Sequence, residues 1–149
     1  MTMEQTCVLI KPDGIGKKVV GDIVKRFEAE GLKLIGMKMM RPSQEKIEGF
    51  YEVHKGKPFF GAFIGFMVSG PIIASVWEGD NAVTHVRSVI GATNSKDAAA
   101  GTLRNLYGTD NRKNLVHASD SAENAHREIQ FFFAKDEVIS YDGYEWKSK

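Results

Sequence analysis

Apolar and polar residues follow one another along this chain in two different periods, which predict strands and helices in turn. Residues 8–10 are a continuous apolar run, and residues 32–40, LKLIGMKMM, alternate well enough for a second strand. Between these strands, apolar side chains recur at helical spacing at Val20, Ile23, Val24 and Phe27. Gly31 then suits the end of that helix, because glycine adopts the left-handed conformation in which many helices end.

The residues that follow the first strand have the composition of a tight turn. Pro12, Asp13 and Gly14 are each common in turns, proline because of its fixed φ and glycine because of its conformational freedom. We therefore expect Lys11 at the end of the strand, where its side chain can reach the edge of a sheet.

A long charge-free segment, residues 59–77, occupies the middle of the chain. Its length is close to that of a membrane-spanning helix. However, Ser69, Gly70 and Pro71 form a turn signal that would break such a helix, and residues 72–77 favour a strand. We expect a helix, a turn and a buried strand here, and no membrane span.

Further helices are expected on both sides of this segment. Ser43 can cap a helix that runs toward Tyr51, and Pro58 can open the next one. Beyond the charge-free segment, an amphipathic helix is marked by Val83, Val86 and Ile90. This helix is expected to end near Gly91.

The last third of the chain combines a long loop with one strand and one helix. Residues 92–113 show no period and predict a loop, whereas residues 115–118 predict a short strand. One face of the last helix carries Ala122, Ala125, Ile129 and Phe132. The tail from Lys135 has no clear period, and we expect it to wrap a neighbouring surface or to fray.

The order of these elements is typical of an α+β fold. It matches the βαββαβ pattern of a ferredoxin-like, four-stranded antiparallel sheet covered by helices. A helical insertion precedes the third strand and the long loop precedes the last one. We find no internal repeat or linker, so residues 1–149 are expected to form a single domain.

Composition narrows the functional classes. The 149 residues are 42% hydrophobic and 26% charged, which is enough apolar sequence for one hydrophobic core. The net charge of +1 does not indicate a protein that binds nucleic acid or a membrane through its overall charge. The single Cys7 excludes an intrachain disulfide. Because the N-terminus lacks the pattern of a signal peptide, we expect a cytoplasmic location.

The segment NLVHASDS, residues 114–121, carries the first candidate for chemistry. Asp120 and Glu123 have the spacing of a helix start, which places His117 on the rim of the sheet just before a helix N-terminus, where an anion is favoured. A lone histidine at a strand end is more often structural than catalytic. Glu128 changes this picture, because it lies at the border of the last helix's apolar face and could hold the imidazole in one orientation.

A second group of residues could hold phosphates. Charges and donors come from a strand end, a helix and the long loop, at Lys11, Arg87, Thr93 and Arg104. Each of these residues alone is more often an ordinary surface residue. The segment GIGKK, residues 14–18, lacks the spacing and the hydroxyl residue of a P-loop, so it is given no such role.

NLVHASDS resembles the active-site signature of nucleoside diphosphate kinases. The resemblance covers nearly the whole chain, since LIKPDGIGKKVVGDIVKRFEAEGLKLIGMKM, PFFGAFIGFMVSGPIIASVWEG, VRSVIGATN and AGTLR are also similar to that family. The resemblance implies ping-pong transfer of the γ-phosphate of a nucleoside triphosphate, typically ATP, to a nucleoside diphosphate of any base through a phosphohistidine. A neutral imidazole can attack without first losing a proton, which agrees with this mechanism.

The resemblance also assigns roles to individual residues. It makes His117 the nucleophile, with Glu128 orienting its ring, Ser119 supporting the glutamate and Tyr51 beside the ring. Phosphate contacts match Lys11, Arg87, Thr93 and Arg104, the sugar contact matches Asn114 with Lys11, and the base-stacking aromatic matches Phe59. Phe60 is expected in the core. Mg²⁺ is implied as a cofactor bridging phosphates and water, so no multi-carboxylate metal cage is expected. The residues leave open which ring nitrogen is phosphorylated.

Some positions depart from the family pattern. Ser95 and Ala100 stand where prolines are common, which leaves the long loop more flexible in the unfolded chain. Asn111 stands where an apolar residue often covers the base. Ala118 replaces a common glycine, which has a cost only if φ there is positive.

Two other functions stay open. One is a nucleotide-binding or regulatory module without turnover, although the near-neutral charge argues against nucleic acid as its main partner. The other is a phosphohistidine relay to a partner protein. The resemblance further implies a homo-oligomer, either a tetramer or, as we favour, a hexamer. The aromatic tail residues Tyr141, Tyr144 and Trp146 suggest a C-terminus that packs against a neighbouring subunit.

Overall fold

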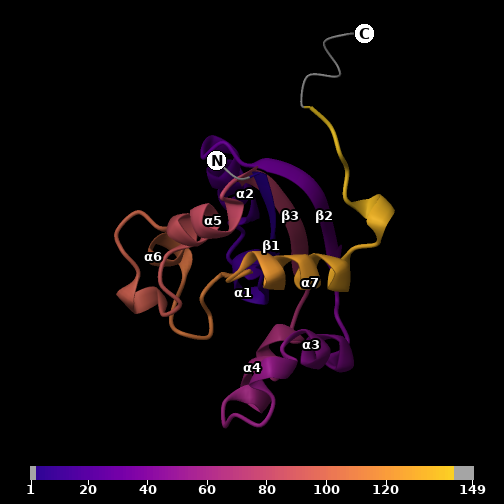
Figure 1. The fold of residues 1–149 in the computed structure, drawn as a ribbon. Helices are drawn as coiled ribbons and strands as arrows, with labels where there is room; N and C mark the ends of the chain where they lie inside the picture. Colours follow the sequence, from indigo (N-terminus) through magenta and orange to yellow (C-terminus); the bar gives the residue numbers. More distant parts are fainter. Residues whose placement is uncertain (1–2, 143–149) are drawn as a thin grey trace.

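The computed structural model describes residues 3–142 and contains one antiparallel sheet (Figure 1). Its strands are β1 (Met3–Ile10), β2 (Lys33–Met40), β3 (Ile72–Asp80) and β4 (Val116–Ala118). They lie in the order β2-β3-β1-β4, and every neighbouring pair is antiparallel. The predicted α+β, ferredoxin-like sheet with its βαββαβ order is confirmed.

Helices cover both faces of this sheet, because side chains of β1 alternate between two cores. Val8 and Ile10 belong to the core beneath α2 (Val20–Ala29) and α5 (Ala82–Ile90), whereas Cys7 and Leu9 belong to the core beneath α7 (Ala122–Phe132). α7 crosses the opposite face from α2 and α5 (Figure 1). Gly31 and Gly91 follow α2 and α5 with positive φ, as their helix-ending role requires.

The predicted insertion between β2 and β3 consists of α3 (Gln44–Phe50), the short η1 (Glu52–His54) and α4 (Phe60–Met67), and it lies beyond one end of the sheet (Figure 1). Ser43 caps α3 as predicted, because its Oγ accepts the N–H of Lys46 at 3.1 Å. Pro58 does not open α4 directly, since that helix begins at Phe60.

The charge-free segment forms α4, a turn and β3, as predicted. Within the part of the chain that the structure describes, no helix is long and apolar enough to span a membrane. Phe60 packs partly buried against the core beneath α7, as expected.

The prediction of a tight turn after β1 is wrong. Pro12–Gly16 instead form a short helix, α1, with proline at its first position, where a missing N–H costs nothing. Gly14 lets this helix approach the strand, because a Cβ there would lie 2.9 Å from Cγ2 of Ile10. Turn composition and helix-start composition overlap in proline and aspartate, so the sequence favoured the wrong element.

The loop before β4 also contains helix that its sequence did not predict. η2 (Ser95–Asp97) and α6 (Leu103–Tyr107) lie within it, and Thr102 caps α6 by accepting the N–H of Asn105 at 3.4 Å. Five residues are too few to establish a helical period, which explains the missed element.

The cap of α7 differs from the predicted one by a single residue. Ser121, not Asp120, is the N-cap, because Ser121 is extended and its Oγ accepts the N–H of Asn124 at 3.0 Å. Asp120 instead accepts a hydrogen bond from the side chain of Asn124, at 2.6 Å.

The described part of the tail packs against its own chain. After η3 (Lys135–Glu137), Ile139 donates its N–H to the carbonyl of Ile35 at 2.9 Å, and the Tyr141 hydroxyl donates to the carbonyl of Leu34. Tyr141 thus packs on β2 of its own chain, and its expected contact with a neighbouring subunit stays a prediction. Tyr144 and Trp146 lie outside the described residues.

Candidate active site

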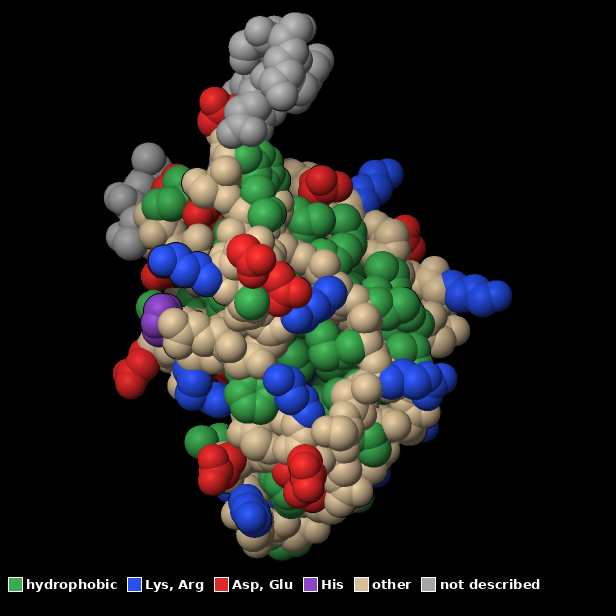
Figure 2. Space-filling view, turned by 90° about the vertical axis from the view of Figure 1, so that its right-hand side faces the viewer, with side chains coloured by type: hydrophobic (Ala, Val, Ile, Leu, Met, Phe, Trp, Pro, Cys, Tyr) green, Lys and Arg blue, Asp and Glu red, His purple; other side chains and the backbone are tan. Residues whose placement is uncertain are grey.

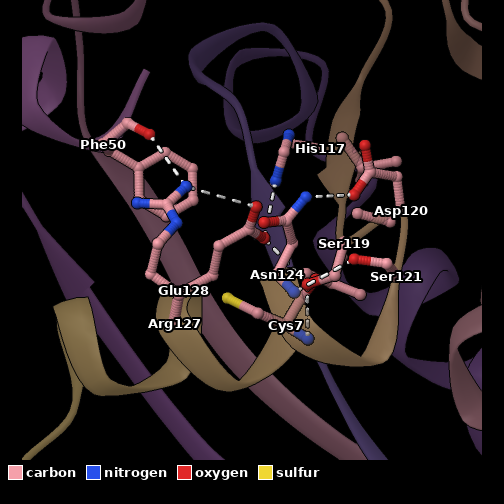
Figure 3. A network of polar contacts seen from close by, with 12 residues as sticks. Cys7, Phe50, His117, Ser119, Asp120, Ser121, Asn124, Arg127 and Glu128 are labelled. Carbon is pink, nitrogen blue, oxygen red and sulfur yellow. Dashed lines mark hydrogen bonds and ion pairs between the residues drawn. The ribbon is translucent and has the colours of Figure 1, made fainter. Parts of the chain in front are cut away.

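His117 and Glu128 meet between β4 and α7. Nε2 of His117 lies 2.9 Å from Oε1 of Glu128, and the hydroxyl of Ser119 donates to the same oxygen at 2.7 Å (Figure 3). Glu128 is buried, although it comes from a polar stretch of helix. The three residues that the sequence grouped around the imidazole are thus in direct contact.

Ser119 is held in turn by β1. Its Oγ accepts the N–H of Cys7 at 3.3 Å, and its N–H donates to the carbonyl of Cys7 at 3.1 Å. The serine hydroxyl therefore has a fixed direction toward the carboxylate. Because β4 pairs with β1 through Leu9 and His117, the same strand also positions the imidazole.

Aromatic rings enclose the imidazole from two sides. The ring centroids of Phe50 and Tyr51 lie 5.2 Å and 5.5 Å from that of His117, both at nearly perpendicular angles. The Tyr51 hydroxyl is buried and has no hydrogen-bond partner among residues 3–142. Burial, together with the charge of Glu128, raises the pKa of Tyr51 well above its usual value. The Tyr51 hydroxyl is therefore a neutral donor without an acceptor in the described part of the chain.

Two residues of this network were not identified from the sequence as parts of the site. Phe50 was treated only as part of a helix, and Arg127 was not considered. Nη2 of Arg127 donates to the carbonyl of Phe50 at 3.3 Å and lies 3.9 Å from Oε2 of Glu128 (Figure 3). Arg127 directly precedes Glu128, which is the only signal that could have drawn attention to it.

Lys11 and Asn114 form the next part of the site. Nζ of Lys11 donates to Oδ1 of Asn114 at 2.6 Å, and Nδ2 of Asn114 donates to the carbonyl of Thr93 at 2.9 Å. Burial lowers the pKa of Lys11 to about 7, and the charge of Arg104 acts in the same direction against a weaker opposing effect of Asp13. Among residues 3–142, no carboxylate lies within ion-pair distance of Lys11, so this buried amine is suited to receive an anion.

Arg104 is fixed by backbone carbonyls. It is buried and donates to the carbonyl oxygens of Gly91, Asn114 and Val116 at 3.0, 3.1 and 2.8 Å. Burial and the nearby charge of Arg87 lower its pKa to about 10, so it remains cationic at neutral pH. Arg87 donates to the carbonyl of Ala118 at 3.2 Å. Ala118 itself is not among the residues with positive φ, so its replacement of glycine carries no backbone cost.

These groups line one cleft of about 770 Å³. The predicted residues along its wall are Lys11, Tyr51, Phe59, Arg87, Thr93, Arg104, Asn114, His117 and Glu128, and Ser119 lies behind Glu128. Phe59 is 48% exposed, so its ring is accessible from the cleft. Basic residues that the sequence did not single out also line the cleft, namely Lys96, Arg112, Lys113 and Arg127.

Basic side chains outnumber acidic ones along the cleft, where seven lysines and arginines face Asp110, Asp120 and Glu128. On the face shown in Figure 2, acidic and basic side chains are interspersed with hydrophobic ones, without a continuous basic surface. This distribution favours a small polyanion held in a pocket over a long nucleic acid held along a surface.

Comparison with known proteins agrees with this geometry. The family model described as nucleoside diphosphate kinase matches residues 4–138. The nucleoside diphosphate kinase of Staphylothermus marinus is 51% identical over 141 residues, which are 95% of this chain and 100% of the relative. That of Anaeromyxobacter sp. (strain K) is 48% identical over 147 residues, which are 99% of this chain and 98% of the relative.

Solved structures lead to the same family. A nucleoside diphosphate kinase from Aquifex aeolicus has a TM-score of 0.91 at 42% identity, covering 93% of this chain and 100% of that one. One from Halobacterium salinarum, solved in complex with CDP, has a TM-score of 0.91 at 45% identity, covering 95% and 94%. On sequence, fold and the grouping of its polar side chains, this chain belongs to the nucleoside diphosphate kinase family of phosphotransferases.

Proposed function

We propose that this chain transfers the γ-phosphate of a nucleoside triphosphate, typically ATP, to a nucleoside diphosphate through a phosphohistidine on His117. The observation that carries the proposal is the contact of His117 with Glu128 in a cleft lined by buried cations. In the first half-reaction the imidazole lone pair forms an N–P bond while the bond from phosphorus to the β–γ bridging oxygen breaks. The nucleoside diphosphate leaves, and a second one reverses the step.

Nδ1 is the attacking nitrogen in this proposal. Because Nε2 faces the Glu128 carboxylate, which can only accept a hydrogen bond, the proton of a neutral imidazole belongs on Nε2. Nδ1 then carries the lone pair. As the N–P bond forms, the ring becomes positive, and the carboxylate stabilises that charge.

Cations in the cleft neutralise the transferring phosphates. Lys11, Arg87 and Arg104 are assigned this role, with Thr93 as a neutral donor, because phosphoryl transfer depends mainly on positioning and charge stabilisation. The unpartnered hydroxyl of Tyr51 can donate to a phosphoryl oxygen on His117.

The nucleoside end of the substrate is assigned to Phe59 and to the pair of Asn114 and Lys11. Phe59 offers its exposed face for stacking, and stacking accepts any base, which supports broad specificity. The Halobacterium salinarum relative was solved with CDP, which supports a nucleotide in this cleft as well.

Magnesium is proposed as the cofactor. Among residues 3–142, no group of three or more His, Cys, Asp or Glu side chains could hold a metal ion. If bound, Mg²⁺ would be held mainly by nucleotide phosphates and water, and Asp120, a carboxylate of the cleft, would accept a hydrogen bond from such a water. The hydrogen bond from Asn124 lowers the pKa of Asp120, which keeps this carboxylate ionised. When bound, the ion would neutralise phosphate charge.

A homo-oligomer built from dimers is also proposed, with the hexamer favoured over the tetramer. β2 is an edge strand. Its own tail bonds the carbonyls of Leu34 and Ile35, but beyond them β2 exposes Met37 and Met39, and an apolar edge of this kind favours pairing with a second copy. The choice of hexamer depends on the family resemblance alone. Light scattering of the purified protein tests it, and a monomer would refute the assembly.

The function is tested with γ-labelled ATP and Mg²⁺, comparing the wild type with His117→Ala and then adding a second nucleoside diphosphate. We expect acid-labile label on the wild type only, released by the second nucleotide as a new triphosphate. Label that forms but resists release would favour a relay to a partner protein. No label on either protein would leave a nucleotide-binding module.

A further inference from the structure

The chain between Asn114 and His117 contains a strained turn. Leu115 has a φ of +79°, and the N–H of Val116 donates to the carbonyl of Asn114 at 2.9 Å, which closes a three-residue turn around Leu115. A bulky residue rarely adopts this conformation, and Leu115 is fully buried. Such strain persists only where the surrounding structure imposes it.

Both backbone polar groups of Leu115 are held by the segment that follows β1. Oδ2 of Asp13 accepts the N–H of Leu115 at 2.9 Å, and the N–H of Lys11 donates to the Leu115 carbonyl at 2.9 Å. Gly14 allows this approach, since a Cβ there would lie 3.2 Å from the Leu115 carbonyl oxygen. α1 is therefore packed directly against the strained turn.

The turn determines where the functional groups of the cleft lie. Asn114, on its near side, bonds Nζ of Lys11 through its side chain, and its carbonyl accepts from Nε of Arg104 at 3.1 Å. His117 follows the turn after one intervening residue. A change at Leu115 would thus move Asn114 and Lys11 relative to the imidazole.

We propose that Asp13 is a positioning residue for phosphoryl transfer, which holds the Leu115 turn and thereby sets the Asn114–Lys11 pair relative to His117. This inference rests on the roles proposed above for those three residues. Asp13 acts through the backbone, because its Oδ2 is used by Leu115 and its Oδ1 is buried without a hydrogen-bond partner among residues 3–142.

The first test compares Asp13→Ala with Asp13→Asn. The amide oxygen of asparagine can still accept the N–H of Leu115, whereas alanine cannot. We expect Asp13→Ala to lower kcat/KM by roughly ten- to hundredfold and to raise KM for the nucleoside diphosphate. Asp13→Asn should retain most of the wild-type kcat/KM. Equal losses in the two variants would overturn the proposal, because the hydrogen bond would then be irrelevant.

The second test varies the strain itself. Leu115→Ala and Leu115→Gly both remove the buried side chain, but only glycine adopts a φ near +79° without cost. Adding Asp13→Ala should reduce kcat/KM strongly in the alanine background and at most a few-fold in the glycine background. A similar loss in both would refute the role of Asp13 in holding the turn. If Asp13→Ala alone does not fold, the same order is expected in the melting temperatures of the two double variants.

Hydrogen exchange of the Leu115 amide provides a measurement that does not depend on activity. Asp13→Ala should lose protection at this amide, and Asp13→Asn should retain it, while the core of β3 stays protected in both. If the wild type protects this amide but does not exchange γ-phosphate, the proposed function fails and the structural role of Asp13 stands. Unchanged protection in Asp13→Ala would contradict that structural role.

Discussion

The carboxylate of Glu128 lies 2.9 Å from the imidazole of His117, and it also accepts the hydroxyl of Ser119 at 2.7 Å on the same oxygen. The hydroxyl fixes which oxygen faces the ring, and the carboxylate fixes which nitrogen carries the proton. Glu128, the seventh residue of α7, is therefore oriented by contacts with side chains of β4 and the residue that follows it, which β1 holds in place.

Glu128→Gln tests the charge of this contact separately from its geometry. Glutamine can keep a hydrogen bond to Nε2 but cannot stabilise the positive ring that forms on attack, so we expect phosphorylation of His117 to slow by about 10- to 100-fold. Rapid-mixing kinetics of the first half-reaction would measure this. Glu123→Gln on the exposed first turn of α7 is the matched control and should react at the wild-type rate. An unchanged rate in Glu128→Gln would contradict the assigned role.

Tyr51→Phe should separate stability from activity. The Tyr51 hydroxyl is buried without a partner among the described residues, so removing it should not decrease the free energy of unfolding and can raise it by about 1 kcal/mol. If this hydroxyl donates to the phosphoryl group, the same variant should lose turnover. Urea denaturation and exchange assays on one preparation measure both effects. A destabilised but fully active variant would show that the hydroxyl has a structural partner instead.

Much of this architecture could be predicted from the pattern of apolar residues. α7 has enough residues to show a clear helical period, and β3 could be recognised as an apolar run behind a turn signal. His117 and Glu128 could be paired because a strand end and a helix face constrain their positions. α1 and α6 have five residues each, so no period distinguishes them from turns or loops.

Contacts between segments that are distant in the sequence could not be predicted either. The roles of Phe50 and Arg127 depend on the packing of α3 beside α7, and the positive φ of Leu115 is imposed by Asp13 from 102 residues away. Neither feature leaves a local signal, because leucine and arginine at these positions fit an ordinary strand and an ordinary helix surface.

The lowered pKa of Lys11 predicts a pH dependence of nucleotide binding. Burial lowers this pKa from 10.5 to about 7, so above pH 7 the free folded protein has lost a proton that the unfolded chain keeps up to about pH 10.5. Stability should accordingly rise with pH across this window, because the unfolded state binds more protons there. Bound phosphates favour the charged amine, so binding takes up a proton and affinity falls as pH rises above 7.

Calorimetry in buffers of different ionisation enthalpy measures that proton uptake. At pH 8 the apparent binding enthalpy of a nucleoside diphosphate should depend on the buffer, and in Lys11→Met this dependence should decrease. Lys25→Met, which removes a lysine of α2 outside the residues lining the cleft, is the control and should behave as the wild type does. Equal proton uptake in Lys11→Met would assign the titration to another group.

Ser95→Ala should stabilise the loop before β4. Ser95 is 5% exposed, and its hydroxyl has no hydrogen-bond partner among residues 3–142, so the folded state has lost the hydration of this group without compensation. We expect the free energy of unfolding to rise by about 1 kcal/mol. Ser43→Ala is a control of opposite sign, because it removes the N-cap of α3 and should cost about 1 kcal/mol. Denaturant titrations of both variants measure these changes in the free energy of unfolding. A loss of stability in Ser95→Ala would contradict the prediction and would mean that the hydroxyl is hydrogen-bonded to water or to a second copy of the chain.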